Sequence, residues 1–182
     1  MAHENPSSVR SKKMLTEALL ALMREEGYES ITITQLCGRS GLSRSAFYSN
    51  FKTKEDVLGH YLDALRPVLR DVMPGTRMDL EEKLRHCFCA VEEDKSGLRA
   101  LLDDRSLYVK AAVADFMAEA IHVTNPFAGS LPGEVNGIME AAVSGAVAGV
   151  LAYWVRNDFT PDAVALAHVF SKVLAGAEHM VM

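Results

Sequence analysis

The stretch Ile31–Leu58 reads ITITQLCGRSGLSRSAFYSNFKTKEDVL, and it decides the fold of this chain. Thr32 can cap a helix over residues 33–40, because its hydroxyl can accept a hydrogen bond from the first turn. Gly41 can end that helix, since glycine adopts the left-handed conformation at little cost. Ser43 can then cap a second helix. The stretch therefore predicts a helix-turn-helix.

The second helix of this motif is expected to have an apolar and a polar side. Leu42 and Phe47 should face inward, and Cys37 is small enough to let the two helices approach closely. The side chains left on the outside form a face suited to a polar partner, and they are Arg44, Ser45, Tyr48, Ser49 and Asn50.

The segment GLSRSAFYSNFKTKEDVL, residues 41–58, resembles the end of the DNA-binding segment of TetR-type transcriptional regulators. That family typically shows Gly, an apolar residue and Ser, followed by Phe-Tyr, Phe and a Lys-x-Lys-Glu run. The resemblance covers residues 12–65, because upstream positions match the core and cap residues of the family's first two helices: Leu15, Ala18, Leu19, Leu22, Gly27, Tyr28, Thr32, Ile33 and Leu36. Four residues depart from the commonest pattern and bear on the operator sequence and the backbone contacts: Cys37, Ala46, Ser49 and Asn50.

The resemblance also implies which residues contact DNA. Positions matching Tyr48, Lys52 and Lys54 contact the DNA backbone in the family, and a phenol and two ammonium groups near helix N-termini can meet phosphates. The alternative for these residues is a solvated helix face. Candidates for base reading, or for phosphate contact at the groove edge, are Ser43, Arg44, Ser45 and Asn50. Hydroxyls at the start of the preceding helix can also bind phosphate, which adds Thr32 and Thr34, although Thr32 can equally serve as a cap without a ligand.

Charge is unevenly divided along the 182 residues. The net charge is −5, whereas residues 1–60 carry eight Lys and Arg against seven Asp and Glu. This balance argues against non-specific coating of nucleic acid and leaves room for a local basic patch near the N-terminus. Three cysteines are too few for a disulfide framework, and no signal peptide opens the chain, so we expect a reducing cytoplasm.

Small and apolar residues fill the last two expected helices, over residues 134–157 and 161–179. The longest uncharged run, Ala141–Val155, falls short of the ~20 residues that a membrane span needs, so we expect a buried helix and no membrane partner. A helix that is apolar on most sides must be covered on most sides. The same pair of helices from a second subunit would cover these two, which predicts a homodimer.

The other periodic segments also have helical spacing, which predicts an all-α fold of about nine helices. Besides those already described, helices are expected from Ser7 or Ser8 to Glu26, from Thr53 past a kink at Pro67, and over residues 79–94, 96–102 and 104–122. Breaks are expected at Pro74-Gly75 and Asn125-Pro126. We expect a three-helix helix-turn-helix domain over residues 1–53 and a helical ligand-sensing and dimerisation domain over residues 54–182.

Catalysis is not indicated. The histidines are scattered, and the sequence has no His-x-x-x-His or Cys-x-x-Cys pair and no Gly-rich phosphate loop, so no metal, cofactor or enzyme activity is expected. The family resemblance implies a pocket for an unknown small-molecule effector. Candidates to line it are interior side chains of types that are more often plain core, namely Tyr61, His86, Phe88, Tyr108, Phe116 and Trp154.

Together these patterns predict a cytoplasmic, ligand-responsive repressor that binds double-stranded operator DNA. The alternative is a coregulator of the same fold that acts through a protein partner, without direct operator binding.

Overall fold

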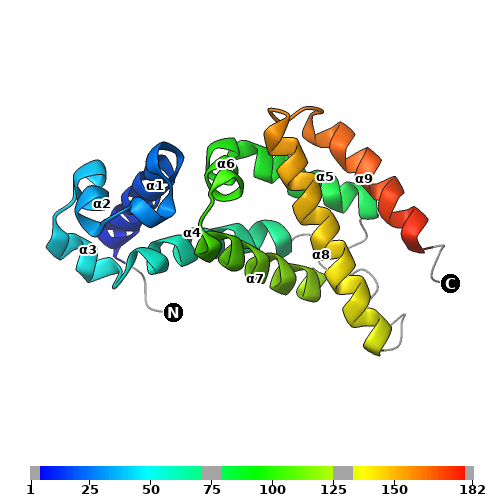
Figure 1. Cartoon of the computed structure of the whole chain (residues 1–182), viewed down its shortest axis with the longest axis horizontal. Helices are drawn as coiled ribbons and strands as arrows, with labels where there is room; N and C mark the ends of the chain where they lie inside the picture. The colour runs from blue at the N-terminus through cyan, green and yellow to red at the C-terminus, as the bar shows by residue number, and fades with distance from the viewer. Residues whose placement is uncertain (1–4, 71–78, 125–132, 179–182) are drawn as a thin grey trace. The chain divides into compact units, whose positions relative to one another are not determined.

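The computed structural model describes residues 5–70, 79–124 and 133–178, and all regular structure in these ranges is helical (Figure 1). The N-terminal elements are α1 (Pro6–Glu26), the 3₁₀ turn η1 (Tyr28–Ser30), α2 (Ile33–Ser40), α3 (Arg44–Asn50) and α4 (Lys54–Arg70). They are followed by α5 (Leu80–Glu93), α6 (Lys95–Asp103), α7 (Leu107–Thr124), α8 (Gly133–Arg156) and α9 (Ala163–Glu178). The all-α prediction is confirmed. The breaks expected at Pro74-Gly75 and Asn125-Pro126 lie outside the described residues.

By packing, the chain divides into two compact units. The first comprises the described residues up to Ala64 together with Arg99–Val113, and the second comprises Leu65–Leu98 and the described residues from Ala114 onward. α4 begins in the first unit and ends in the second, and Pro67 lies inside this helix. The boundary expected after residue 53 concerns function and stays a prediction.

The start of α1 differs from the expected cap at Ser7 or Ser8. Asn5 is the cap, because its side-chain oxygen accepts a hydrogen bond from the Ser7 N–H at 3.0 Å. Pro6 occupies the first helical position, where its missing N–H costs nothing and its fixed φ suits a helix. Gly27 ends α1 with φ 78°, a conformation that favours glycine.

A helix was expected to start at residue 104, but α7 begins at Leu107 and a short junction separates it from α6. Asp104 and Ser106 are buried in that junction. Ser106 caps α7, since its hydroxyl accepts from the N–H groups of Tyr108 and Val109 at 3.1 and 3.3 Å. Both residues favour caps and turns over helix interiors, which explains the break.

The core of the second unit is an aromatic cluster between α5, α8 and α9. Phe88 packs against Trp154 and Phe170, with ring centroids 5.9 and 6.1 Å apart. Phe159 packs against Trp154 at 5.1 Å, and all four side chains are buried. Burying rings of this size contributes to the stability of this unit.

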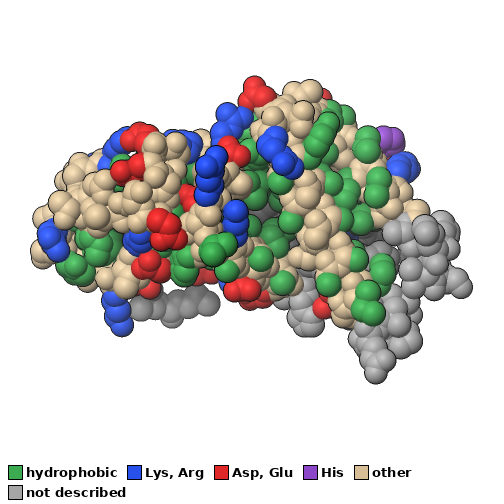
Figure 2. Space-filling view, in the orientation of Figure 1, with side chains coloured by type: hydrophobic (Ala, Val, Ile, Leu, Met, Phe, Trp, Pro, Cys, Tyr) green, Lys and Arg blue, Asp and Glu red, His purple; other side chains and the backbone are tan. Residues whose placement is uncertain are grey.

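In the single chain α8 is only partly covered, and its expected cover by a second subunit stays a prediction. Its buried apolar side chains include Val143, Leu151, Trp154 and Val155, whereas Ile138 and Tyr153 are exposed. Hydrophobic side chains are visible along α8 in Figure 2. By length and composition alone Gly137–Arg156 could cross a membrane, a test that the core helix of a globular protein also passes.

Candidate nucleic-acid interface

Two capped helices and a glycine turn build the predicted helix-turn-helix. Thr32 and Gln35 form a capping box at α2, in which the Thr32 hydroxyl accepts from the Gln35 N–H at 3.2 Å and the Gln35 Oε1 accepts from the Thr32 N–H at 2.8 Å. Gly41 ends α2 in the left-handed conformation, with φ 70° and ψ 15°. The Ser43 hydroxyl caps α3 by accepting from the Ala46 N–H at 3.1 Å. These three positions match the expectation from the sequence.

The inner side of this motif is fixed by apolar packing. Leu36 and Phe47 are fully buried, and Cys37 and Phe51 are nearly so. Leu15 and Leu19 of α1 are also fully buried, and α1 packs against both α2 and α3. The orientation of α3 is therefore set by its buried side.

The outer side of α3 is polar and exposed. Arg44, Ser45, Tyr48 and Ser49 are exposed, and Lys52 lies just beyond the helix with an exposed side chain. Tyr48 is 52% exposed and its ring meets Phe47 edge to face, with centroids 5.3 Å apart. Arg44 and Tyr48 are four residues apart and share one helix face. This face presents a guanidinium, a phenol and hydroxyls to the surroundings.

Asn50 has internal partners. Its Nδ2 donates to the Ala46 carbonyl at 2.7 Å, and its Oδ1 accepts from the Ser8 hydroxyl of α1 at 2.6 Å. The amide therefore ties the end of α3 to the start of α1. Its expected role in reading bases stays a prediction.

Lys54 is also engaged internally. Its Nζ donates to the carbonyls of Tyr28, Glu29 and Ile31 at 2.9, 3.4 and 3.1 Å. It also lies 4.4 Å from the centroid of the Tyr28 ring. No pattern in the sequence indicated these bonds, because the partners lie 23 to 26 residues away.

Tyr28 contacts three other side chains of the first unit, those of Lys54, Glu55 and Tyr108. Its hydroxyl donates to Glu55 Oε1 at 3.1 Å, and its ring stacks on Tyr108 at 5.5 Å with an angle of 12° between the planes. The side chain is almost completely buried. Burial, reinforced by the Glu55 carboxylate, raises the pKa of Tyr28 well above its usual range, so the phenol stays neutral and remains a donor.

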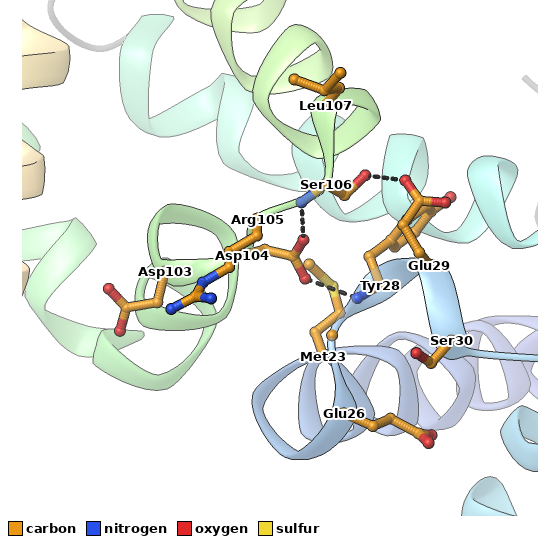
Figure 3. Close-up of a pocket in the computed structure, with 11 residues that line it drawn as sticks. Met23, Glu26, Tyr28, Glu29, Ser30, Asp103, Asp104, Arg105, Ser106 and Leu107 are labelled. Carbon is orange, nitrogen blue, oxygen red and sulfur yellow. Dashed lines mark hydrogen bonds between the residues drawn. The ribbon is translucent and has the colours of Figure 1, made fainter.

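A pocket of about 610 Å³ opens beside η1 in the same unit, between the end of α1 and the α6–α7 junction (Figure 3). Asp104 is one of the residues that line it and accepts from the N–H groups of Tyr28 and Ser106, both at 2.8 Å. The Ser106 hydroxyl, in the α6–α7 junction, donates to the Glu29 carboxylate of η1. The lining residues are Met23, Glu26, Gly27, Tyr28, Glu29, Ser30, Asp103, Asp104, Arg105, Ser106 and Leu107.

None of the six residues expected to bind an effector lines this pocket. Tyr61 and Tyr108 belong to the first unit, and the other four belong to the second. Within the second unit Phe88 and Trp154 pack on each other, Phe116 is buried beside Arg66, and His86 is exposed. Direct mutual packing of Phe88 and Trp154 is the geometry of core residues. Their expected role in binding an effector stays a prediction.

Metal binding has no support in the part of the chain that the structure describes, where no group of three or more His, Cys, Asp or Glu side chains could hold an ion.

The fold and the capped α2–α3 pair define a helix-turn-helix protein. Residues 15–61 match the family of bacterial regulatory proteins called the tetR family. An uncharacterized HTH-type transcriptional regulator of Mycobacterium bovis is 29% identical over 178 residues, which cover 91% of this chain and 81% of that protein. A protein of the same description from Mycobacterium tuberculosis matches to the same extent.

Solved structures of transcriptional regulators have a similar fold. A TetR transcriptional regulator from Streptococcus agalactiae superposes with a TM-score of 0.66 at 17% identity, covering 91% of this chain and 94% of that one. The fatty acid degradation regulator FadR from Bacillus halodurans superposes with a TM-score of 0.64 at 18% identity, covering 96% and 97%. Residues 15–61 therefore match the helix-turn-helix domain of the tetR family, and over most of its length the chain is similar to HTH-type transcriptional regulators.

Proposed function

We propose that this regulator binds operator DNA directly through α3 and acts as a ligand-responsive repressor. The observation that carries the proposal is the two-sided build of α3, in which a fully buried Phe47 fixes the helix while Arg44 and Tyr48 face outward. Because its buried side fixes its orientation, α3 can present the exposed side chains to the major groove without a prior change in the position of the helix. The comparisons support the class of protein, and the exposed face supports the contact with DNA.

The exposed residues divide by chemistry. Arg44 can pair bidentately with guanine in the major groove, and Ser45 can reach either a base edge or a phosphate. Tyr48 and Lys52 are suited to phosphates. Ser43 and Thr34 lie at the starts of α3 and α2, where they can meet phosphates at the groove edge. Thr32 and Asn50 complete the proposed set of DNA-binding residues, and their side chains are also bonded within the domain.

We propose further that the protein is a homodimer through α8 and α9. Val164, Val169 and Val173 of α9 are 54%, 58% and 59% exposed, and Val169 and Val173 lie one turn apart. Gly145 and Gly149 of α8 are exposed, and a Cβ at either would meet nothing within 4 Å. Such surfaces suit close approach of a second copy. Two copies would also supply the two recognition helices with which helix-turn-helix dimers bind the two half-sites of an operator.

The proposed response to a small molecule follows the resemblance to the tetR family. The pocket beside η1 has a volume typical of small-molecule sites, about 300–1,000 Å³. An effector would act by binding one conformation of the regulator better than the other, and so would shift the population that binds DNA. A location in the cytoplasm, where operator DNA lies, belongs to the same proposal.

The alternative is a coregulator that acts through a protein partner. One observation favours it, since the internal bonds of Lys54 and Asn50 leave two fewer side chains for DNA. A gel-shift assay with the DNA upstream of the protein's own gene separates the two functions. Direct operator binding predicts a shifted band that survives excess scrambled duplex. A partner-dependent coregulator would give that band only after its partner is added.

A further inference from the structure

The ammonium group of Lys54 lies at the end of η1. It is within hydrogen-bond distance of three carbonyls, those of Tyr28, Glu29 and Ile31. An ammonium has three donors and no acceptor; two of them make bonds of ordinary length, to Tyr28 and Ile31, and the contact with Glu29 is longer, at 3.4 Å. The nearby Tyr28 ring, 4.4 Å from Nζ to centroid, adds a cation–π attraction. Lys54 is therefore a cap for η1 that comes from the first residue of α4.

This cap connects both ends of the helix-turn-helix. η1 leads through Ile31 directly into Thr32, which caps α2. Lys54 follows α3 after only three residues, at the start of α4. The lysine thus joins the segment that enters the motif to the segment that leaves it. The Tyr28 carbonyl also accepts from the Ile31 N–H at 3.2 Å, so Lys54 adds to the backbone bond that closes η1. Removing the ammonium would release the connection between η1 and α4.

We propose that Lys54 is a positioning residue for DNA recognition, which holds α2 and α3 in their binding orientation and does not donate a hydrogen bond to a phosphate. The inference rests on the proposed operator binding. It differs from what the family resemblance implies for this position, because the ammonium group faces the carbonyls of η1.

Lys52 provides the matched comparison. It lies two residues earlier and has an exposed side chain. Its backbone N–H, and not its ammonium, is bonded to Asp56 Oδ2, at 2.8 Å. We assign the phosphate contact in this part of the chain to Lys52.

The test uses the full-length protein and three variants, Lys54→Met, Lys54→Arg and Lys52→Met. Fluorescence anisotropy gives the affinity for the operator and for a scrambled duplex across a salt series, well below the unfolding temperature of each variant. Each lost phosphate contact lowers the slope of log K against log salt by about 0.9. Lys52→Met should lower it on both duplexes, by roughly two for a dimer.

Lys54→Met should behave differently. It should leave the slope on scrambled DNA unchanged and weaken operator binding by about tenfold or more, because the helices that read the operator are less well oriented. Lys54→Arg keeps the positive charge but replaces the compact ammonium with a planar guanidinium, so it should restore that loss only in part. If Lys54→Met fails to fold, Lys54→Gln replaces it, since its amide keeps donors without charge and should keep the wild-type slope.

Two results would overturn the inference while leaving operator binding intact. A slope on scrambled DNA that falls as much for Lys54→Met as for Lys52→Met would make Lys54 a phosphate contact. Unchanged operator affinity in the folded Lys54→Met protein would leave it a purely structural residue. Absence of any operator preference in the wild type would instead refute the proposed function itself.

Discussion

Asp104 Oδ2 accepts a hydrogen bond from the Tyr28 N–H at 2.8 Å, across 76 residues of sequence. The other carboxylate oxygen accepts from the Ser106 N–H at 2.8 Å, and Asp104 is only 6% exposed. This one side chain therefore ties the α6–α7 junction to η1. It gives a physical reason why Arg99–Val113 packs with the N-terminal elements as one unit.

Replacing Asp104 with Ala should destabilise the first unit. Two backbone N–H groups would lose their partner, at a cost of about 1–3 kcal/mol for each one that stays buried. Asp103→Ala is the matched control, since Asp103 is exposed and its loss should change stability by less than about 0.5 kcal/mol. Urea unfolding of both variants gives the change in the free energy of unfolding. Equal decreases in the two variants would show that the Asp104 carboxylate does not stabilise the contact between η1 and the α6–α7 junction.

The helix-turn-helix was predictable because its determinants are local. Thr32, Gly41 and Ser43 each act on backbone groups within three or four residues, so sequence spacing contains the information. The bonds from Asp104 and Lys54 to η1 join residues that are distant in sequence. Nothing in the identity of an aspartate or a lysine indicates such a partner before the fold is known.

For the expected effector site, the sequence indicates which side chains are buried but not whether they line a pocket. Periodicity places Phe88 and Trp154 in the interior correctly, because apolar spacing reports which helix face is buried. It does not distinguish the wall of a pocket from a packed core. The pocket beside η1 is lined largely by polar residues of turns and helix ends, which have no apolar periodicity to reveal them.

Disrupting the apolar face of α9 should dissociate the dimer. In the double variant Val169→Glu and Val173→Glu, two carboxylates would be buried at the proposed interface without partners, which is costly. Lys172→Ala on the same helix is the control and should leave the dimer unchanged. Light scattering at micromolar concentration measures both. A wild-type protein that is monomeric under these conditions would contradict the assignment.

Cys87 should react slowly with alkylating reagents. Burial raises the pKa of Cys87 to about 11, whereas a free cysteine has a pKa near 8.5, so the thiol stays protonated at pH 8. The neutral thiol contributes stability that is fully present below the unfolded pKa and is lost as the pH rises through about 11. Mass spectrometry after timed iodoacetamide treatment at pH 8 and pH 10 follows this residue. Modification at pH 8 at the rate of free cysteine would contradict the raised pKa.

Contact between the outward face of α3 and DNA is tested most directly by hydroxyl-radical footprinting of the upstream region. We expect two protected half-sites whose centres lie about one helical turn, ~34–36 Å, or a multiple of it apart. Arg44→Ala should fold normally, because Arg44 is exposed, and should lose about 1–3 kcal/mol per half-site on the operator and less on scrambled DNA. A region protected by the wild type and released by Arg44→Ala is the predicted result. Absence of protection at concentrations where the protein is dimeric, or equal protection by both proteins, would contradict it.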